Sequence, residues 1–473
     1  MHTVTIILIL VLSVVLCGFI ARSRWVKLPL PLIQIAGGTG LALFGVQVPL
    51  DPDIFFLLFI PPLLFLDGWR IPKGAFFSDA RSILMLAIGL VLFTVLGMGF
   101  FIDWLIPSVP LAVAFALGAY QAGVYHALHE HGLAPDWVVG TSIGAINAAI
   151  LAGNKHEDRL VRLKQFWQRV AHRDSIDMNL VSDQQRRSNI WLATLDTVLR
   201  GVPGFFKPRA FSLFPAGIAV KPEEASFYDT SELASTLDEL VDFDHLNQPG
   251  GMRLTVNALR VKCGSLTSFD SQHQPLTAEH IRASGALPPG FAGVRVDGDL
   301  YWDGGLYSNT PLETVLDDTP HVDTLVFMVD LWSAEGPEPT TLDEVQTRQK
   351  DVTVASRSKR HIADYVNTHT LQRKLRELYA KLPDTAHNRQ QTEELVALGC
   401  DSTMHIVRLP YAGRDWHMAA KDINFSRGSI EWRWEQGYQD GLRAIKAAGW
   451  LAFVTEDTPL VVHELPPYER DAA

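Results

Sequence analysis

Two long uncharged stretches near the N-terminus constrain this chain more than any other feature. Residues 3–21 (TVTIILILVLSVVLCGFIA) and 82–102 (SILMLAIGLVLFTVLGMGFFI) contain no charged side chain. A hydrocarbon core of ~30 Å needs roughly 20 apolar residues in a helix, so each stretch is long enough to cross a bilayer. Between them, residues 28–50 are uncharged but interrupted by glycines, and residues 54–66 form a shorter apolar run. We therefore predict four spans in an all-α transmembrane segment, residues 1–110.

The charges between these stretches predict how the spans are oriented. The loops 22–27 and 67–81 carry the basic residues, whereas the loop 51–53 carries only acidic ones. Basic loops favour the cytoplasmic side, so the chain would emerge outside after a fourth span, or inside after a fifth. A cleaved signal peptide is the alternative for residues 3–21. A basic leading region is missing and further apolar segments follow, which disfavours that alternative.

The front of the chain resembles the opening of monovalent cation/proton antiporters. The resemblance covers about residues 1–117 and rests on LPLPLIQIAGGTG, DPDIFFLLFIPPLLFLDGWRIPK and PLAVAFALGA. It implies a multi-pass segment in a bacterial inner membrane. Such transporters bind their ion between later broken helices near the membrane midplane. Those helices are missing from this sequence, so a transporter fragment is the least favoured function.

The composition of the remaining chain excludes several classes of protein. After residue 103 the sequence has 35 basic and 47 acidic residues, a net charge of −12 that disfavours a nucleic-acid binder. Three widely separated cysteines exclude a disulfide scaffold. No phosphate-binding loop or dinucleotide fingerprint occurs. His126 and His129 have the spacing of a metal pair, but a polar helix face explains them as well, and we predict no metal and no organic cofactor. The sequence does not predict the oligomeric state.

The sharpest motif of this body is Gly140-Thr141-Ser142-Ile143-Gly144. It follows DWVV, an apolar run typical of a buried strand, and precedes AINAAILAG, a small-residue run typical of a helix. G-x-S-x-G in this context is a nucleophile elbow, a tight strand-to-helix turn that exposes the serine. We expect bulk at Gly140 or Gly144 to clash there. The helix N-terminus offers N–H groups and partial positive charge to an oxyanion.

A serine nucleophile needs a base, and the sequence offers a carboxylate. Twelve histidines follow Ser142, but none lies in a segment that singles it out. Asp303 ends the apolar run Leu-Tyr-Trp and is followed by Gly304 and Gly305, which permit close backbone approach. A D-G turn in a hairpin is the alternative explanation of this motif.

Taken together, these residues resemble the patatin-like phospholipases. The matching pieces are GAYQAGVYHALHEHGLAPDWVVGTSIGAINAAILAGN and RASGALPPGFAGVRVDGDLYWDGGLYSNTPL, within a body of residues 111–330. The resemblance implies a three-layer α/β/α hydrolase in which Ser142 is the nucleophile and Asp303 its base. It implies an enzyme, a carboxylic-ester hydrolase acting on fatty-acyl esters of membrane lipids. The last part, residues 331–473, resembles an extension of a bacterial subgroup through KDINFSRGSIEWRWEQGYQDGL.

The family pattern breaks at its glycine-rich oxyanion loop. The six corresponding positions, 113–118, read VAFALG, so only Gly118 remains as a doubtful oxyanion donor. Valine and phenylalanine resist the backbone conformations that glycine permits. The alternative function is therefore a catalytically impaired, membrane-anchored hybrid. Residues 111–117 suit a first buried strand of the hydrolase, which we expect, or the start of a fifth span.

Two further segments carry surface features. Residues 348–381 hold nine basic and three acidic side chains, a charge that suits an anionic leaflet or a solvated helix face. Trp432, Trp434 and Tyr438 suit an interfacial helix or packing on the hydrolase, and we expect the packing.

Overall fold

A computed structural model describes the body of the chain. The described residues are 115–172, 193–209 without 195, 219–381 without 309 and 321, 402–411, 423–451 and 460–465, with the single positions 18 and 34. The chain divides into two compact units, 1–102 and 103–473. The expected membrane spans and residues 111–114 lie outside the described part. Among the described residues, no helix combines the length and the apolar character that crossing a bilayer requires.

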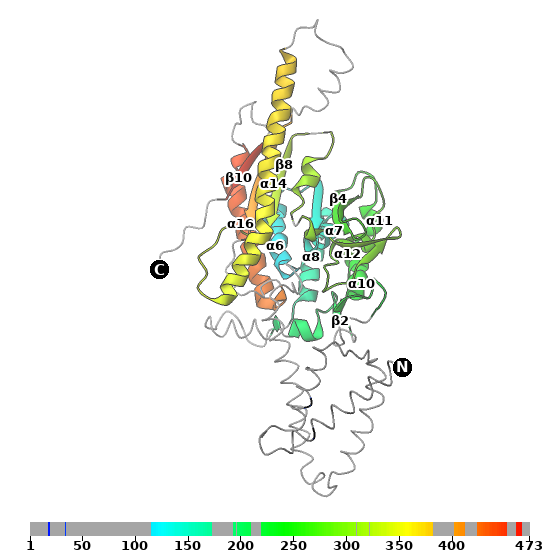
Figure 1. Ribbon diagram of the computed structural model, residues 1–473. Helices are drawn as coiled ribbons and strands as arrows, with labels where there is room; N and C mark the ends of the chain where they lie inside the picture. The colour runs from blue at the N-terminus through cyan, green and yellow to red at the C-terminus, as the bar shows by residue number, and fades with distance from the viewer. Residues whose placement is uncertain are drawn as a thin grey trace, which may run out of the picture. The chain divides into compact units, whose positions relative to one another are not determined.

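A mixed five-stranded sheet forms the centre of the body (Figure 1). Its spatial order is β1-β4-β7-β6, with β5 also paired to β4. The chain therefore has the α/β character expected of a hydrolase body. The strands are β1 (Trp137–Thr141), β4 (Arg253–Arg260), β5 (Ser265–Asp270), β6 (Val294–Val296) and β7 (Asp299–Asp303).

The register of β4 brings two strand ends together. β1 runs parallel to β4 as far as Thr141, which lies opposite Asn257. β7 runs antiparallel to β4 and reaches Asp303, which lies opposite Ala258, the next residue of β4. The last residues of β1 and β7 therefore lie at neighbouring positions along β4.

The two faces of β4 differ in character because side chains alternate along a strand. Leu254, Val256 and Ala258 are fully buried in the apolar core, where α7 (Ile143–Ala152) and α12 (Ala278–Ser284) pack against the sheet. Among the described residues before 300, the other α-helices include α6 (Gly118–Glu130), α8 (His156–Val170), α10 (Ser231–Leu240) and α11 (Phe243–Leu246).

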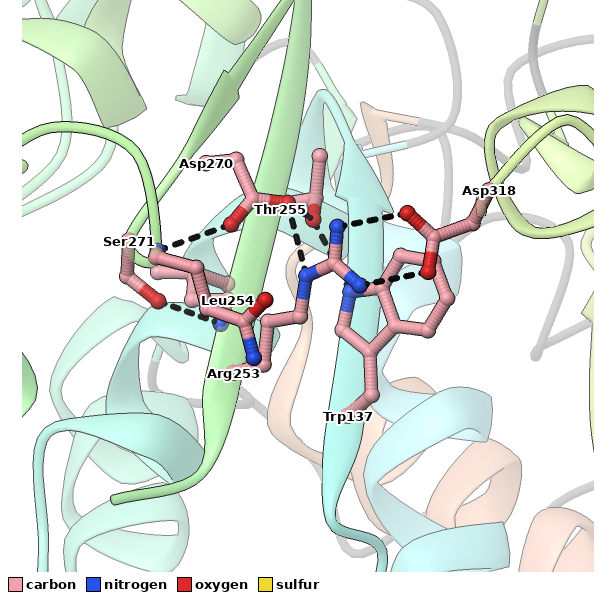
Figure 2. Close-up of polar contacts among 8 residues, drawn as sticks. Trp137, Arg253, Leu254, Thr255, Asp270, Ser271 and Asp318 are labelled. Carbon is pink, nitrogen blue, oxygen red and sulfur yellow. Dashed lines mark hydrogen bonds and ion pairs between the residues drawn. The ribbon is translucent and has the colours of Figure 1, made fainter. Parts of the chain in front are cut away.

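The opposite face of β4 carries a polar network, shown in Figure 2. The Arg253 guanidinium donates to Asp270 at 2.9 Å and to both carboxylate oxygens of Asp318 at 2.7 and 2.9 Å. Its central carbon lies 3.9 Å from the centre of the Trp137 ring. The indole N–H of Trp137 donates to Thr255 at 2.8 Å. This network ties β1, β4 and β5 to the residues after α13 (Leu312–Leu316).

A parallel three-stranded sheet of order β10-β9-β8 follows the central one in sequence. The buried Arg408 guanidinium donates to Asp330 at 2.9 Å and to Glu464 at 3.0 Å, so one ion-pair network crosses all three strands. The strands are β8 (Thr324–Asp330), β9 (Met404–Pro410) and β10 (Leu460–Glu464), and a short pair consists of β2 (Lys207–Pro208) and β3 (Tyr228–Asp229).

Two distant helices, α6 and α16 (Arg427–Ala447), pack backbone against backbone. A Cβ atom added at Gly123 would lie 1.9 Å from the carbonyl oxygen of Trp434, and one added at Gly437 would lie 2.0 Å from that of Tyr120. The Tyr120 hydroxyl also donates to Asp440 at 2.7 Å in this buried contact. The C-terminal residues therefore complete the core of the body. The described part of the chain also contains the long helix α14 (Leu342–Ala380) and the short 3₁₀ helix η7 (Gly449–Leu451).

The first described segment differs from our expectation of a buried strand over 111–117. Residues Phe115–Leu117 form a 3₁₀ helix, η1, that continues directly into α6. The Phe115 ring lies 5.2 Å from the rings of both Phe205 and Phe291, so it is buried without strand pairing. A short apolar run does not distinguish a buried strand from a buried helical turn.

Candidate active site

The turn between β1 and α7 has the geometry of a nucleophile elbow. Ser142 is the residue between strand and helix, with φ 58° and ψ −125°, in a region that side-chain-bearing residues rarely adopt. A Cβ atom at Gly140 would lie 2.4 Å from the backbone carbon of Gly144, so position 140 requires glycine. Our expectation of a clash at Gly144 was wrong. A Cβ atom there would only touch the Gln121 side chain, at 3.5 Å.

Asp303 lies at the end of β7, beside this turn. Ser142 is one of two hydrogen-bonding neighbours that lower the pKa of Asp303. The backbone N–H of Gly305 donates to Asp303 Oδ1 at 2.7 Å. A Cβ atom at Gly304 would lie 2.4 Å from the carbonyl oxygen of Asn257, so this glycine permits the approach of the η4 turn (Gly304–Leu306) to β4. The structure therefore places the two sequence-predicted residues at neighbouring strand ends, with Ser142 directly after β1 and Asp303 as the last residue of β7.

The protonation of Asp303 is unusual for a carboxyl group. Its exposed fraction is 1%, and this burial raises its pKa to about 7. The hydrogen bonds from Ser142 and Gly305 lower the pKa, but less than burial raises it. A carboxyl group with a pKa near neutrality accepts a proton from a hydroxyl more readily than one with the reference pKa of ~3.9.

Ser284, at the end of α12, is a site residue that the sequence did not reveal. The backbone N–H of Ser142 donates to Ser284 Oγ at 3.1 Å and to its carbonyl oxygen at 3.2 Å. The Ser284 hydroxyl in turn donates to the Asn257 carbonyl at 2.7 Å. This fully buried residue holds the backbone of the elbow in its unusual conformation. Ser284 lies in the RASG run that resembles the family, but no motif distinguishes a buried support from any other serine.

The beginning of α7 supplies candidate oxyanion donors. Ile143 and Gly144 occupy its first turn, where N–H groups have no partner within the helix. Gly118, the doubtful donor, packs against this turn, since a Cβ atom on it would lie 2.3 Å from Ile143 Cγ1. The Asn147 side chain on α7 donates to the Gly118 carbonyl of α6 at 3.0 Å, which fixes the distance between α6 and α7.

The histidines and aromatic residues of α6 and α16 form a packed contact. His126 accepts from the Trp434 indole at 3.1 Å and lies 3.2 Å from Glu130, which in turn accepts from the Tyr438 hydroxyl. The centres of the His129 and His156 rings lie 4.5 Å apart, with the ring planes inclined by 31°. In the described part of the chain, no cluster of three or more histidine, cysteine and acidic residues could hold a metal ion. Trp434 and Tyr438 thus pack against α6 of the body, as we expected.

The family of this body follows from comparison with known proteins. Residues 114–316, which contain Ser142, Ser284 and Asp303, match the family model of patatin-like phospholipases. This body is patatin-like. A second model, described as patatin phospholipase, matches residues 352–457, and a third, the transmembrane sodium/hydrogen exchanger, matches residues 10–122. The patatin and exchanger matches overlap at 114–122, which includes η1 and the beginning of α6.

Several curated relatives match the front of the chain. The uncharacterized Na(+)/H(+) exchanger YjcE of Escherichia coli is 50% identical over 115 residues, which are 24% of this chain and 21% of that protein. The sodium, potassium, lithium and rubidium/H(+) antiporter of Bacillus pumilus is 46% identical over 112 residues, 22% of this chain and 17% of that protein. The chain thus spans about a fifth of the length of these antiporters.

Among solved structures, VipD from Legionella pneumophila gives a TM-score of 0.30 at 14% identity. The match covers 70% of this chain and 65% of that one, and the score is too low to equate the two folds.

Proposed function

We propose that this chain is a serine lipid acyl hydrolase, anchored in a bacterial inner membrane by its multi-pass N-terminal segment. The placement of Ser142, at a strained strand-to-helix turn, beside the strand end that carries the buried Asp303 is the observation that carries the proposal. The patatin-like match of the surrounding residues supports a three-layer α/β/α scaffold and a fatty-acyl ester of a membrane lipid as substrate.

The proposed reaction has two halves. Ionised Asp303 accepts the proton of the Ser142 hydroxyl while Ser142 Oγ attacks the ester carbonyl carbon. Asp303 then passes this proton to the leaving alcohol oxygen, and the C–O bond of the ester breaks to give an acyl-enzyme. Water attacks the acyl-enzyme, with Asp303 again accepting the proton. The proton returns to Ser142 Oγ as the fatty acid leaves.

The developing oxyanion requires donors that are fixed in advance. The N–H groups of Ile143 and Gly144 are the candidates, because they begin a helix whose dipole favours negative charge at this end. Ser284 positions this turn through the backbone of Ser142. In this proposal the helix N-terminus performs the role for which patatins also use their glycine-rich loop.

A catalytically impaired hybrid is the second candidate function. Residues 115–117 lack glycine and are buried as the helical turn η1, whose Ala116 carbonyl accepts from the buried Arg433 at 3.1 Å. A segment held in this way is a poor source of oxyanion donors. Loss of a single oxyanion donor lowers the reaction rate about 10²–10³-fold in a known case. The rate of ester hydrolysis therefore depends on whether residues 115–117 supply such a donor.

Hydrolysis of a chromogenic fatty-acyl ester by the full chain in detergent tests both candidates. Turnover that disappears in Ser142→Ala and Asp303→Asn supports the dyad. Equal rates in all three proteins would refute it. Labelling by a fluorophosphonate separates the candidates further, because it needs an activated serine but no second half-reaction. Labelling without turnover favours the impaired hybrid.

A further inference from the structure

The long helix α14 leaves one end of itself outside the packed core. Its middle part packs through Ile362, Tyr365 and Val366 onto the small core cluster of β8, β9, β10 and α13. The Tyr365 hydroxyl also donates to Asp317 at 3.0 Å. Figure 1 shows the C-terminal end of α14 running on past the strands of the body. The C-terminal end of α14 can therefore contact a surface outside the apolar core.

Three leucines occupy the outer side of this end. Leu371, Leu375 and Leu378 are 68%, 42% and 66% exposed. They follow one another at spacings of four and three residues, so they lie in a stripe about 60° wide along the helix. Isolated exposed leucines are ordinary, but an aligned set on one turn after another is typical of an interaction surface.

Basic side chains predominate beside this leucine stripe. Lys374 and Lys381 are exposed, and each lies three residues after a stripe leucine, on the same flank. Residues 371–381 contain four basic side chains and one acidic, Glu377, whereas the whole chain has a net charge of −11. This surface is therefore a local cationic exception on an acidic protein.

We propose that the leucine stripe of α14 docks on an anionic lipid surface. Leucines enter the boundary between headgroups and acyl chains, and lysines beside them reach the lipid phosphates with their long stems on the apolar layer. Charge complementarity selects this occupant, because the acidic remainder of the protein is repelled by the same surface. Docking would hold the body against a membrane independently of catalysis.

A polarity-sensitive dye at Leu378→Cys tests this docking in the full chain, with Cys17, Cys263 and Cys400 replaced by serine. The protein is reconstituted into phosphatidylcholine vesicles with and without phosphatidylglycerol. We expect a blue shift of the dye emission in the anionic vesicles and its reversal by high salt. Val161→Cys on α8, 53% exposed and equally apolar, is the matched control and should not shift.

The lysines give the second part of the test. Each lysine near an anionic surface contributes about fivefold to binding, so Lys374→Gln combined with Lys381→Gln should lower the docking constant about 30-fold. An unshifted dye at position 378, or a shift of the same size at 161, would overturn the proposal. Self-quenching of the dye in detergent, without lipid, would also overturn it, since the stripe would then pair with a second copy. The shift should persist in Ser142→Ala, so failure of docking and failure of the proposed hydrolysis are distinguishable.

Discussion

The pH dependence of acylation is the most direct consequence of the buried carboxyl group. Asp303 must be ionised to accept the Ser142 proton, and burial raises its pKa to about 7. At pH 5.5 only about 3% of the groups would be ionised, so kcat/KM should lie about 30-fold below its value at high pH. Below neutrality the rate should fall about tenfold for each pH unit.

Unfolding of the protein caused by protonation of Asp303 does not explain the loss of kcat/KM at low pH. Between its ordinary pKa of ~3.9 and about 7, Asp303 holds its proton in the folded state but loses it in the unfolded state. Its contribution to stability is therefore fully present at low pH and is lost as the pH rises through 7. Activity and this part of the free energy of unfolding should change in opposite directions.

The assay is the hydrolysis of a soluble chromogenic ester from pH 5.5 to 8.5, with fluorophosphonate labelling of Ser142 measured over the same range. Both rates should show a midpoint near 7. Asp303→Asn should be nearly inactive at every pH, and an exposed carboxyl change, Asp297→Asn, should leave the profile unchanged. A flat profile, or a midpoint near the reference value of ~3.9, would show that this carboxyl group is not the base.

Three further predictions concern the supports of the site. Ser284→Ala removes the hydroxyl between Ser142 and Asn257, so the free energy of unfolding measured with denaturant should fall by about 1–3 kcal/mol and labelling of Ser142 should slow; unchanged labelling would contradict its positioning role. Gly140→Ala should abolish labelling because its Cβ meets backbone at 2.4 Å, whereas Gly144→Ala should retain it; equal labelling of the two variants would argue against the elbow geometry. Arg433→Met leaves the Ala116 carbonyl without this donor, so the free energy of unfolding from thermal denaturation should fall by about 2–4 kcal/mol. The exposed Arg427→Met should lower it by less than about 0.5 kcal/mol. Equal losses in the two variants would contradict this account.

The local part of the site was predictable from sequence. A strand, a serine turn and a helix follow one another around Ser142, and each is encoded by residues within a few positions of it. The end of β7 at Asp303 was predictable for the same reason, from an apolar run followed by two glycines. Short-range patterns of apolar residues and glycine are sufficient for such elements.

The proximity of Ser142 and Asp303 was not predictable from local sequence patterns. Ser142 and Asp303 come together because Thr141 and Asp303 lie opposite consecutive residues of β4, a strand whose pairing no local pattern specifies. The support from Ser284 depends on the same non-local arrangement. The resemblance to patatins supplied the pair. The expected strand over 111–117 rested on a short apolar run, of which residues 115–117 form the buried 3₁₀ helix η1 instead.

Because α6 packs closely against α16, α6 remains uncovered during synthesis on the ribosome until α16 has been made. About 300 residues separate the end of the first helix from the start of the second, and synthesis at about 5–20 residues per second takes roughly 15–60 s to deliver them. Throughout that interval the nascent α6, which precedes β1 and the serine turn, lacks the helix that covers it. We expect chaperones to engage this intermediate, and a ribosome stalled before residue 427 to carry a body that lacks α16.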